Sequence, residues 1–258
     1  MITEKLKTIR EKIASKDRVN VAWLFLGSPV TAEIMAAAGF DFLILDMEHA
    51  PGGRDAMYHQ IRACEAQGVP VIVRIPEVNA GLIKQALDAG SAGIALPDVR
   101  SLEEAERLVK LSRYAPQGQR GTHRLARAAG YGMSWQEYYD EVVPNLLAMV
   151  LIESPEGAAI ASEMGAMDGI DVIFIGAVDL ASCLGHVGNP GHPEVQAVIR
   201  QIEADVLASG AALGGLAGSP QDAAKKFEAG YSVATCGSDA VFLRDHLQSI
   251  AKELDLLP

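Results

Sequence analysis

The sequence predicts an α/β fold, a single (β/α)₈ TIM barrel over residues 1–258, and three observations carry this prediction. Eight short apolar segments with the composition of buried parallel strands alternate with segments of helical periodicity. The length of 258 residues suits one such barrel. No Gly-x-Gly-x-x-Gly turn follows the first strand, which argues against an open dinucleotide-binding sheet and against a nucleotide cofactor.

The predicted strands and helices follow one another in a regular order. An amphipathic helix is expected over residues 2–16, ahead of the first strand. Ser28 and Pro29 are typical of a helix start after that strand, and Gly90 is typical of a helix end. The eight strands are expected at residues 19–26, within 40–51, and at 69–74, 92–97, 146–153, 170–176, 211–217 and 232–236. Helices are expected up to residue 38 and at 54–66, 80–89, 101–113, 135–142 and 239–255, with others between the last strands.

Residues 114–134 interrupt this alternation. The segment is rich in glycine and in basic residues and has little periodicity. It is long for a connection inside a compact domain. We therefore expect a functional loop or an interface element there.

Charge and cysteine content exclude several classes of function. The 22 basic and 33 acidic residues give a formal net charge of −11, whereas nucleic acids and anionic membrane surfaces attract basic faces. Three widely spaced cysteines, Cys64, Cys183 and Cys236, form neither a disulfide framework nor a zinc ligand set. The charged N-terminus lacks a secretory signal, and no apolar run reaches transmembrane length. We therefore expect a soluble, cytoplasmic protein.

Polar side chains collect at the carboxyl ends of four predicted strands. They are Asp46, Glu48 and His49 after the second strand, Arg74 after the third, Glu153 after the fifth and Asp179 after the sixth. Each alone is more often a helix cap or a structural ion-pair partner. Because all these strand ends meet at one mouth of a barrel, the joint arrangement predicts one site.

The residue types at this mouth favour metal-assisted enolate chemistry. Two carboxylates from neighbouring strands, Glu153 and Asp179, suit a hard divalent cation such as Mg²⁺ or Mn²⁺, because zinc usually has more histidine or cysteine ligands. An α-keto acid could fill two of the remaining coordination positions, and the cation would stabilise an enolate. Arg74 could neutralise the same oxyanion, and His49 could move the proton.

Other chemistries of this fold are less well supported. A Schiff-base mechanism needs a lysine inside the barrel, whereas all nine lysines fall in segments with helical character. No Gly-x-Ser-x-Gly elbow indicates a serine hydrolase. A phosphate site stays open, since residues 214–218 and 237–239 are glycine-rich at the usual phosphate position of barrels. Asp239 would repel an anion there.

The motifs resemble those of the HpcH/HpaI aldolase family, the metal-dependent (class II) pyruvate aldolases. The matching segments are residues 46–51 (Asp-Met-Glu-His-Ala-Pro), 73–74 (Val-Arg), 152–154 (Ile-Glu-Ser), 174–180, 188–195 and 237–239. The similarity runs nearly end to end. Its motifs are specific for the family and much less so for the substrate.

The resemblance implies a role for individual residues. Glu153 and Asp179 match metal ligands, His49 the catalytic base, Arg74 the group that stabilises the pyruvate enolate, and Asp88 an acid that raises the basicity of the histidine. The backbone amides of Val178 and Asp179 match those that hold the substrate carboxylate, and Trp23 and Leu216 match walls of the aldehyde pocket. Asp46 and Glu48 remain in supporting positions, orienting His49 or ordering water on the metal.

The resemblance also implies an activity and an assembly. The expected reaction is reversible cleavage of a 4-hydroxy-2-oxo acid into pyruvate, or a related 2-oxo acid, and an aldehyde. The expected cofactor is Mg²⁺ or Mn²⁺, with Co²⁺ as a third candidate. Family members assemble as homohexamers, dimers of trimers that exchange C-terminal helices.

Three positions depart from the family pattern. Leu151 replaces the usual glutamine two residues before the metal-binding glutamate, and Ala177 replaces the usual proline after the strand-six glycine. The loop at residues 120–127 is shorter and more basic, so His123 and Arg124 could bind an acidic acceptor or face solvent or a neighbouring subunit. Leu151 keeps open a decarboxylase or lyase that acts on oxaloacetate or a CoA thioester. A metal-binding barrel without activity is the non-catalytic alternative.

Overall fold

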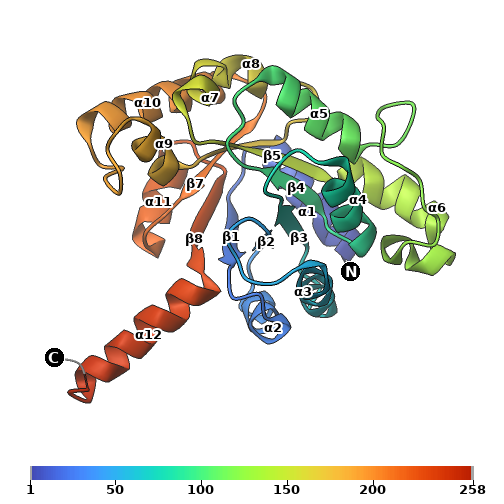
Figure 1. Ribbon diagram of the computed structural model, residues 1–258, viewed down its shortest axis with the longest axis horizontal. Helices are drawn as coiled ribbons and strands as arrows, with labels where there is room; N and C mark the ends of the chain where they lie inside the picture. The colour runs from blue at the N-terminus through green and yellow to red at the C-terminus, as the bar shows by residue number, and fades with distance from the viewer. Residues whose placement is uncertain (1, 257–258) are drawn as a thin grey trace.

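The computed structural model describes residues 2–256 and contains a closed barrel of eight parallel strands in the order β1 to β8 (Figure 1). The strands are β1 (Val19–Leu24), β2 (Phe42–Asp46), β3 (Val71–Arg74), β4 (Gly93–Leu96), β5 (Leu147–Ile152), β6 (Val172–Ile175), β7 (Ala212–Leu216) and β8 (Val233–Ser238). The predicted (β/α)₈ barrel is therefore confirmed. Most strands are shorter than predicted at one or both ends, and β8 is two residues longer at its carboxyl end.

Helices surround the barrel and connect its strands. They are α1 (Ile2–Ala14), α2 (Pro29–Ala37), α3 (Arg54–Ala66), α4 (Ala80–Ala89), α5 (Leu102–Ser112), α6 (Trp135–Glu137), α7 (Pro155–Ala159), α8 (Ala161–Gly165), α9 (Ala177–Cys183), α10 (Pro193–Ala208), α11 (Pro220–Glu228) and α12 (Asp239–Glu253). The bounds of α3 and α4 are those predicted. None of the helices within residues 2–256 combines the length and apolar character needed to cross a membrane.

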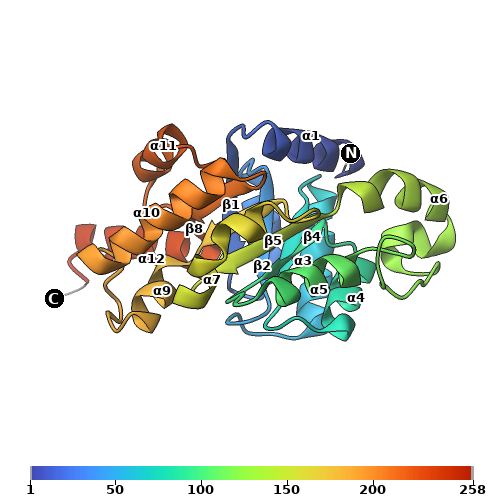
Figure 2. The same cartoon turned by 90° about the horizontal axis from the view of Figure 1, so that it is seen from above.

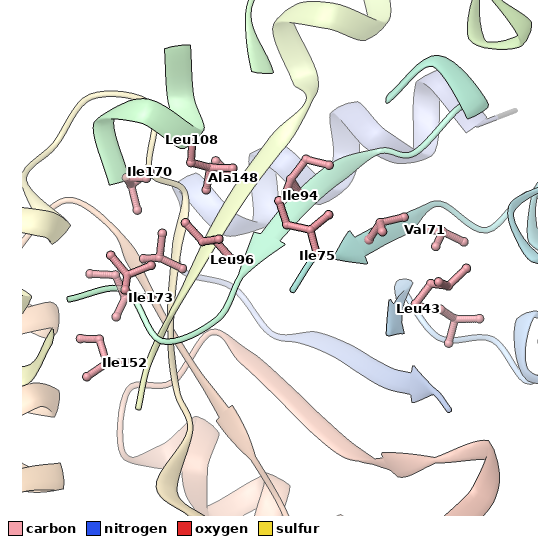
Figure 3. Close-up of a cluster of buried hydrophobic side chains, with 14 of the residues drawn as sticks. Leu43, Val71, Ile75, Ile94, Leu96, Leu108, Ala148, Ile152, Ile170 and Ile173 are labelled. Carbon is pink, nitrogen blue, oxygen red and sulfur yellow. The ribbon is translucent and has the colours of Figure 1, made fainter. Parts of the chain in front are cut away.

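Alternation along the strands divides the core into two regions. On β2, Ile44 packs inside the barrel, whereas Leu43 and Leu45 pack against the surrounding helices. Figure 3 shows part of the outer region, in which aliphatic side chains from the strands meet Leu108 of α5. Burial on both faces explains why the strands read as continuous apolar runs rather than alternating ones.

Helix α1 closes the amino-terminal end of the barrel. Its buried side chains Leu6, Ile9 and Ile13 join the interior cluster, which includes Val19 at the start of β1 and Phe42 at the start of β2. The opposite end of the barrel, formed by the carboxyl ends of the strands, is not covered by α1, and most of the predicted site residues lie there.

Two regions extend from the barrel on opposite sides of the molecule. Both views show α12 projecting away from the strands on one side and the α6 region on the other (Figures 1 and 2). The 114–134 segment contains a distorted 3₁₀ turn, η1 (Arg127–Gly132). The helix expected at 135–142 is only one turn of α6, followed by a π-helical turn, η2 (Tyr138–Val142), and a 3₁₀ turn, η3 (Val143–Asn145).

Candidate active site

Asp46 and Arg74 form a buried, bidentate salt bridge at the carboxyl ends of the barrel strands. They are register partners on β2 and β3. Arg74 Nε donates to Asp46 Oδ1 at 2.9 Å and Nη2 donates to Oδ2 at 2.7 Å. The same carboxylate accepts from the backbone N–H groups of Glu48 (2.8 Å) and His49 (3.3 Å). Asp46 therefore orients both the arginine and the turn that carries the histidine.

Arg74 has two further contacts that restrict its guanidinium. Its Nη1 lies 3.2 Å from Glu48 Oε2. Its Cζ lies 4.6 Å from the centroid of the Trp23 ring, and Trp23 stacks on Phe25 at 5.7 Å. Planar contact of this kind with a desolvated guanidinium is favourable. Trp23 therefore lies against Arg74 and is almost completely buried.

His49 is exposed at the mouth of the barrel. Its side chain is 64% exposed, and its Nε2 lies 3.7 Å from Glu48 Oε2. Burial raises the pKa of Glu48, although Arg74 and His49 oppose the shift. The imidazole can thus reach a bound molecule while an acid stays beside it.

Glu153 lies buried just past the end of β5, close enough to Asp179 for the two carboxylates to repel each other. Its Oε2 accepts from the backbone N–H of Asp98 at 2.9 Å. Burial raises the pKa of Glu153 to about 7, with the carboxylate of Asp179 adding to the shift and Arg74 opposing it. A buried carboxylate beside a second carboxylate favours a bound proton or a bound cation.

Asp179 stands in the first turn of α9, after the N-cap residue Gly176. Val178 precedes it on the surface. First-turn amides of a helix have no intrahelical acceptor, so those of Val178 and Asp179 are available to an anionic group.

The donor set at this mouth fits a hard divalent cation. Glu153 and Asp179 supply oxygen, and Glu48 brings a third carboxylate into the same electrostatic field. The buried Glu48 Oε2 accepts no hydrogen bond within residues 2–256, although it lies 3.2 Å from Arg74 Nη1. A cation with its water would offset the repulsion among these carboxylates.

Asp88 lies away from this cluster. It is in the last turn of α4, and Ala92, four residues later, donates its N–H to the carbonyl of Val71 at the start of β3. Asp88 is thus near the amino-terminal ends of the strands, whereas His49 follows the carboxyl end of β2. No ion pair joins the two within the described part of one chain. Asp88 instead accepts from Arg120 Nη2 at 2.7 Å.

Arg120, which sequence reasoning did not select as an anchor, holds the 114–134 segment. Its buried guanidinium also donates to Tyr138 Oη at 2.8 Å and lies 4.6 Å from the Tyr114 ring. Asp88 also lines a groove of about 440 Å³ between α3, α4 and residues 123–131. His123 lines the same groove and is exposed, so it lies near Asp88 rather than beside Glu153.

Two remaining predicted residues differ in exposure. Leu216 is 49% exposed at the end of β7, on the rim of the mouth. Leu151 is buried in the barrel interior together with Phe174, whose ring meets Trp23 edge-on at 6.1 Å. The interior below Glu153 is therefore apolar.

At the glycine-rich ends of β7 and β8, the N–H groups of Gly218 and Ala240 already donate to the carboxylates of Asp222 and Asp239, each at 2.9 Å. The Asp239 carboxylate accepts from the N–H groups of Phe25 (2.7 Å) and Leu26 (3.2 Å) and from Thr31 Oγ1 (3.0 Å). A protein carboxylate already satisfies these donors, and it would repel a phosphate. Asp239 is a structural link between the β1–α2 connection and α12.

A second group of metal-ligand residue types lies at the start of α10. Ligand atoms of His186, His192 and Glu194 lie within 4.8 Å of one another. His186 Nε2 is hydrogen-bonded to Glu194 Oε2 at 2.9 Å, and His192 Nδ1 accepts from the Glu194 N–H at 3.3 Å. These groups already satisfy one another, and the positive end of α10 disfavours a cation. We interpret the group as a helix cap.

Comparison with known proteins gives a consistent result. Residues 20–245 match the family model "HpcH/HpaI aldolase/citrate lyase". The chain is 38% identical to a 5-keto-4-deoxy-D-glucarate aldolase of Salmonella paratyphi C (89% of each chain). It is 34% identical to a hydroxypyruvate/pyruvate aldolase of Paraburkholderia phytofirmans (91% of this chain, 92% of the relative).

Solved structures agree with the sequence comparison. A crystal structure of an HpcH/HpaI aldolase/citrate lyase family protein from Burkholderia cenocepacia superposes with a TM-score of 0.90 at 32% identity. The match covers 96% of this chain and 99% of that one. Fold, motifs and similarity along nearly the whole chain agree, and the chain belongs to the HpcH/HpaI aldolase/citrate lyase family.

Proposed function

We propose that the protein is a metal-dependent carbon–carbon lyase that reversibly cleaves a 4-hydroxy-2-oxo acid into pyruvate, or a related 2-oxo acid, and an aldehyde. The observation that carries this proposal is the meeting of Glu153 and Asp179 with Arg74 and His49 at one barrel mouth. The carboxylates of Glu153 and Asp179 repel each other there, and a bound metal cation would remove this repulsion. The family membership supports the reaction class.

The residues have distinct roles in the proposed reaction. Glu153 and Asp179 would hold Mg²⁺ or Mn²⁺, with Co²⁺ as a third candidate, and the cation would supply Lewis-acid stabilisation to the 2-oxo oxygen. The amides of Val178 and Asp179 bind the substrate carboxylate. Leu216 lines the aldehyde side, and Trp23 contributes to the same pocket by supporting Arg74 from below.

His49 and Arg74 carry the proton and charge movements. His49 removes the proton of the 4-hydroxyl group, the C3–C4 bond breaks, and the aldehyde leaves. The electron pair passes to the donor as an enolate, whose oxygen is stabilised by Arg74, and a proton returned to C3 gives pyruvate. Asp46 and Glu48 orient Arg74 and the His49 turn.

Asp88 can raise the basicity of His49 only from another copy of the chain, because the two lie near opposite ends of one barrel. We propose that it does so in a homohexamer, a dimer of trimers. Exposed apolar side chains on the projecting α12, Leu243, Leu247 and Ile250, support an exchange of C-terminal helices between subunits.

The test combines pyruvate and a small aldehyde with the purified protein. With Mg²⁺ or Mn²⁺ we expect a 4-hydroxy-2-oxo acid, detected by chromatography and mass spectrometry, and EDTA should abolish its formation. Product formation that survives EDTA, or covalent trapping of pyruvate by borohydride, would contradict the mechanism.

A second candidate is a decarboxylase or lyase that acts on oxaloacetate or a CoA thioester through the same enolate chemistry. The buried Leu151, which leaves the interior below Glu153 apolar, favours it. Release of pyruvate from oxaloacetate faster than any aldol cleavage would support this candidate over the first.

A further inference from the structure

Backbone atoms hold Glu153 on two sides. On one side, the N–H of Asp98 donates to Oε2 at 2.9 Å. On the other, a Cβ added at Gly176 would lie 2.5 Å from both Cγ and Oε1 of Glu153. Oε2 of Glu153 is therefore bonded to an amide, whereas Oε1 accepts no hydrogen bond within residues 2–256 and is free to bind a ligand.

The backbone of Asp98 has the conformation that aims this amide. Its φ is 45°, in the left-handed region that residues other than glycine rarely adopt and that aspartate and asparagine tolerate best. The next amide, Val99 N–H, donates to the carbonyl of Leu151 at 3.2 Å. In an extended strand successive N–H groups point to opposite sides. Asp98 lies two residues past the end of β4, and its left-handed conformation turns its own N–H and that of Val99 to the same side, toward β5. Leu151 lies on β5, and Glu153 follows its last residue.

The side chain of Asp98 contacts Arg100 and not Glu153. Its Oδ2 accepts from Arg100 Nε at 2.9 Å, and its Oδ1 is buried without a partner in the described part of the chain. No side-chain atom of Asp98 bonds to Glu153 within residues 2–256. The contact with Glu153 therefore depends on the backbone conformation of Asp98 and not on its side chain.

We propose that Asp98 is a positioning residue for the cation site: its left-handed backbone fixes Oε2 of Glu153 so that Oε1 is presented to the cation. The inference rests on the proposed function, since it takes Glu153 as a ligand. Outer contacts that orient a metal ligand typically contribute about 10- to 100-fold to metal affinity.

The test is a series of substitutions ordered by tolerance of the left-handed region rather than by charge. Mn²⁺ affinity is measured by titration calorimetry and by electron paramagnetic resonance of free Mn²⁺. We expect D98G and D98N to stay within about threefold of wild type and D98A to be intermediate. D98V, which is β-branched, should bind at least about tenfold more weakly. If D98V does not fold, the comparison of D98G with D98A decides.

A matched control separates positioning from general destabilisation. Lys16 has a similar φ of 58° in the exposed turn after α1, at the opposite end of the barrel. K16V should lower the unfolding midpoint but leave Mn²⁺ affinity unchanged.

The remaining outcomes overturn the inference in distinguishable ways. Equal Mn²⁺ affinity across the series contradicts the inference. Binding by D98G and D98N that is as weak as that of D98V also contradicts it, because the Asp98 carboxylate rather than its backbone N–H would then determine Mn²⁺ affinity. A wild-type protein that binds no Mn²⁺ would sink the proposed function and this inference together. Binding that D98V leaves unaffected sinks the inference alone.

Discussion

Arg74 is held by both oxygens of Asp46, its register partner on the adjacent strand, at 2.9 and 2.7 Å. Both side chains are buried. A planar guanidinium bonded in this way can neither rotate nor slide, so its position is fixed before any substrate binds. Such preorganisation is what stabilisation of a developing oxyanion requires.

Asp46→Asn should therefore reduce both stability and activity. The substitution leaves Arg74 buried with only Glu48 as an acidic partner, and breaking a buried pair costs about 3 kcal/mol. A guanidinium displaced by about 1 Å should lower kcat by roughly 100-fold. Urea unfolding and steady-state kinetics measure the two effects.

Glu106→Gln is the matched control for this substitution. Glu106 pairs with Lys110 at 2.6 Å on the exposed face of α5, where an ion pair is worth about 0.5 kcal/mol or less. Unchanged kinetics in D46N would contradict the role given to Asp46, whatever its stability.

Much of the fold could be predicted because local sequence and tertiary structure agree. Periodicity indicates the bounds of α3, and Asn79 and the left-handed Gly90 set those of α4. The apolar strands end where the polar residues begin. The predicted helix at 135–142 was only partly right, because the π-helical turn η2 replaces the α-helix from Tyr138 to Val142. Side chains of Tyr138 and Val143 pack against Tyr114 there, so tertiary contacts override propensity.

Parts of the site lay beyond sequence reasoning for physical reasons. Strand ends predict which residues share the mouth, but the position of Asp88 within its helix decides which end of the barrel it reaches. The role of Asp98 depends on a backbone amide and a positive φ, which no side-chain type signals. The role of Arg120 depends on its contacts with Tyr138 and Asp88, which are distant from it in the sequence.

Removal of the metal should be reversible and visible in stability as well as activity. A cation that binds only the folded protein contributes about 2.7 kcal/mol at 100 times its Kd, which corresponds to a rise of about 5–10 °C in Tm. Glu153→Gln should abolish this rise with Mn²⁺, measured by calorimetry. Glu194→Gln, in the group of His186, His192 and Glu194 at α10, should keep the rise in Tm with Mn²⁺. Loss of the rise in E194Q but not in E153Q would place the metal site at α10 instead of the barrel mouth.

The cysteines should react in the order of their exposure. Burial raises the pKa of Cys64 to about 12 and also raises the pKa of Cys236, whereas Cys183 is exposed. The thiolate is the reactive form, so at pH 8 the native protein should show one fast thiol, one slow thiol and one that reacts only after unfolding. Disulfide exchange with a chromogenic reagent measures this. C183S should lack the fast phase, and its persistence would contradict the order.

Mixed assemblies should reveal whether Asp88 acts on His49 of another copy. H49A and D88N should each have little activity. In assemblies that contain both variants, a site can combine His49 of one copy with Asp88 of the next. Random pairing in a ring restores about one quarter of the sites. Co-expression with two affinity tags and tandem purification provides the mixed protein, and aldol cleavage is the readout. H49A mixed with R74A should recover nothing, because both residues belong to one mouth. Recovery in that control, or none with H49A and D88N in verified mixed assemblies, would contradict the proposal.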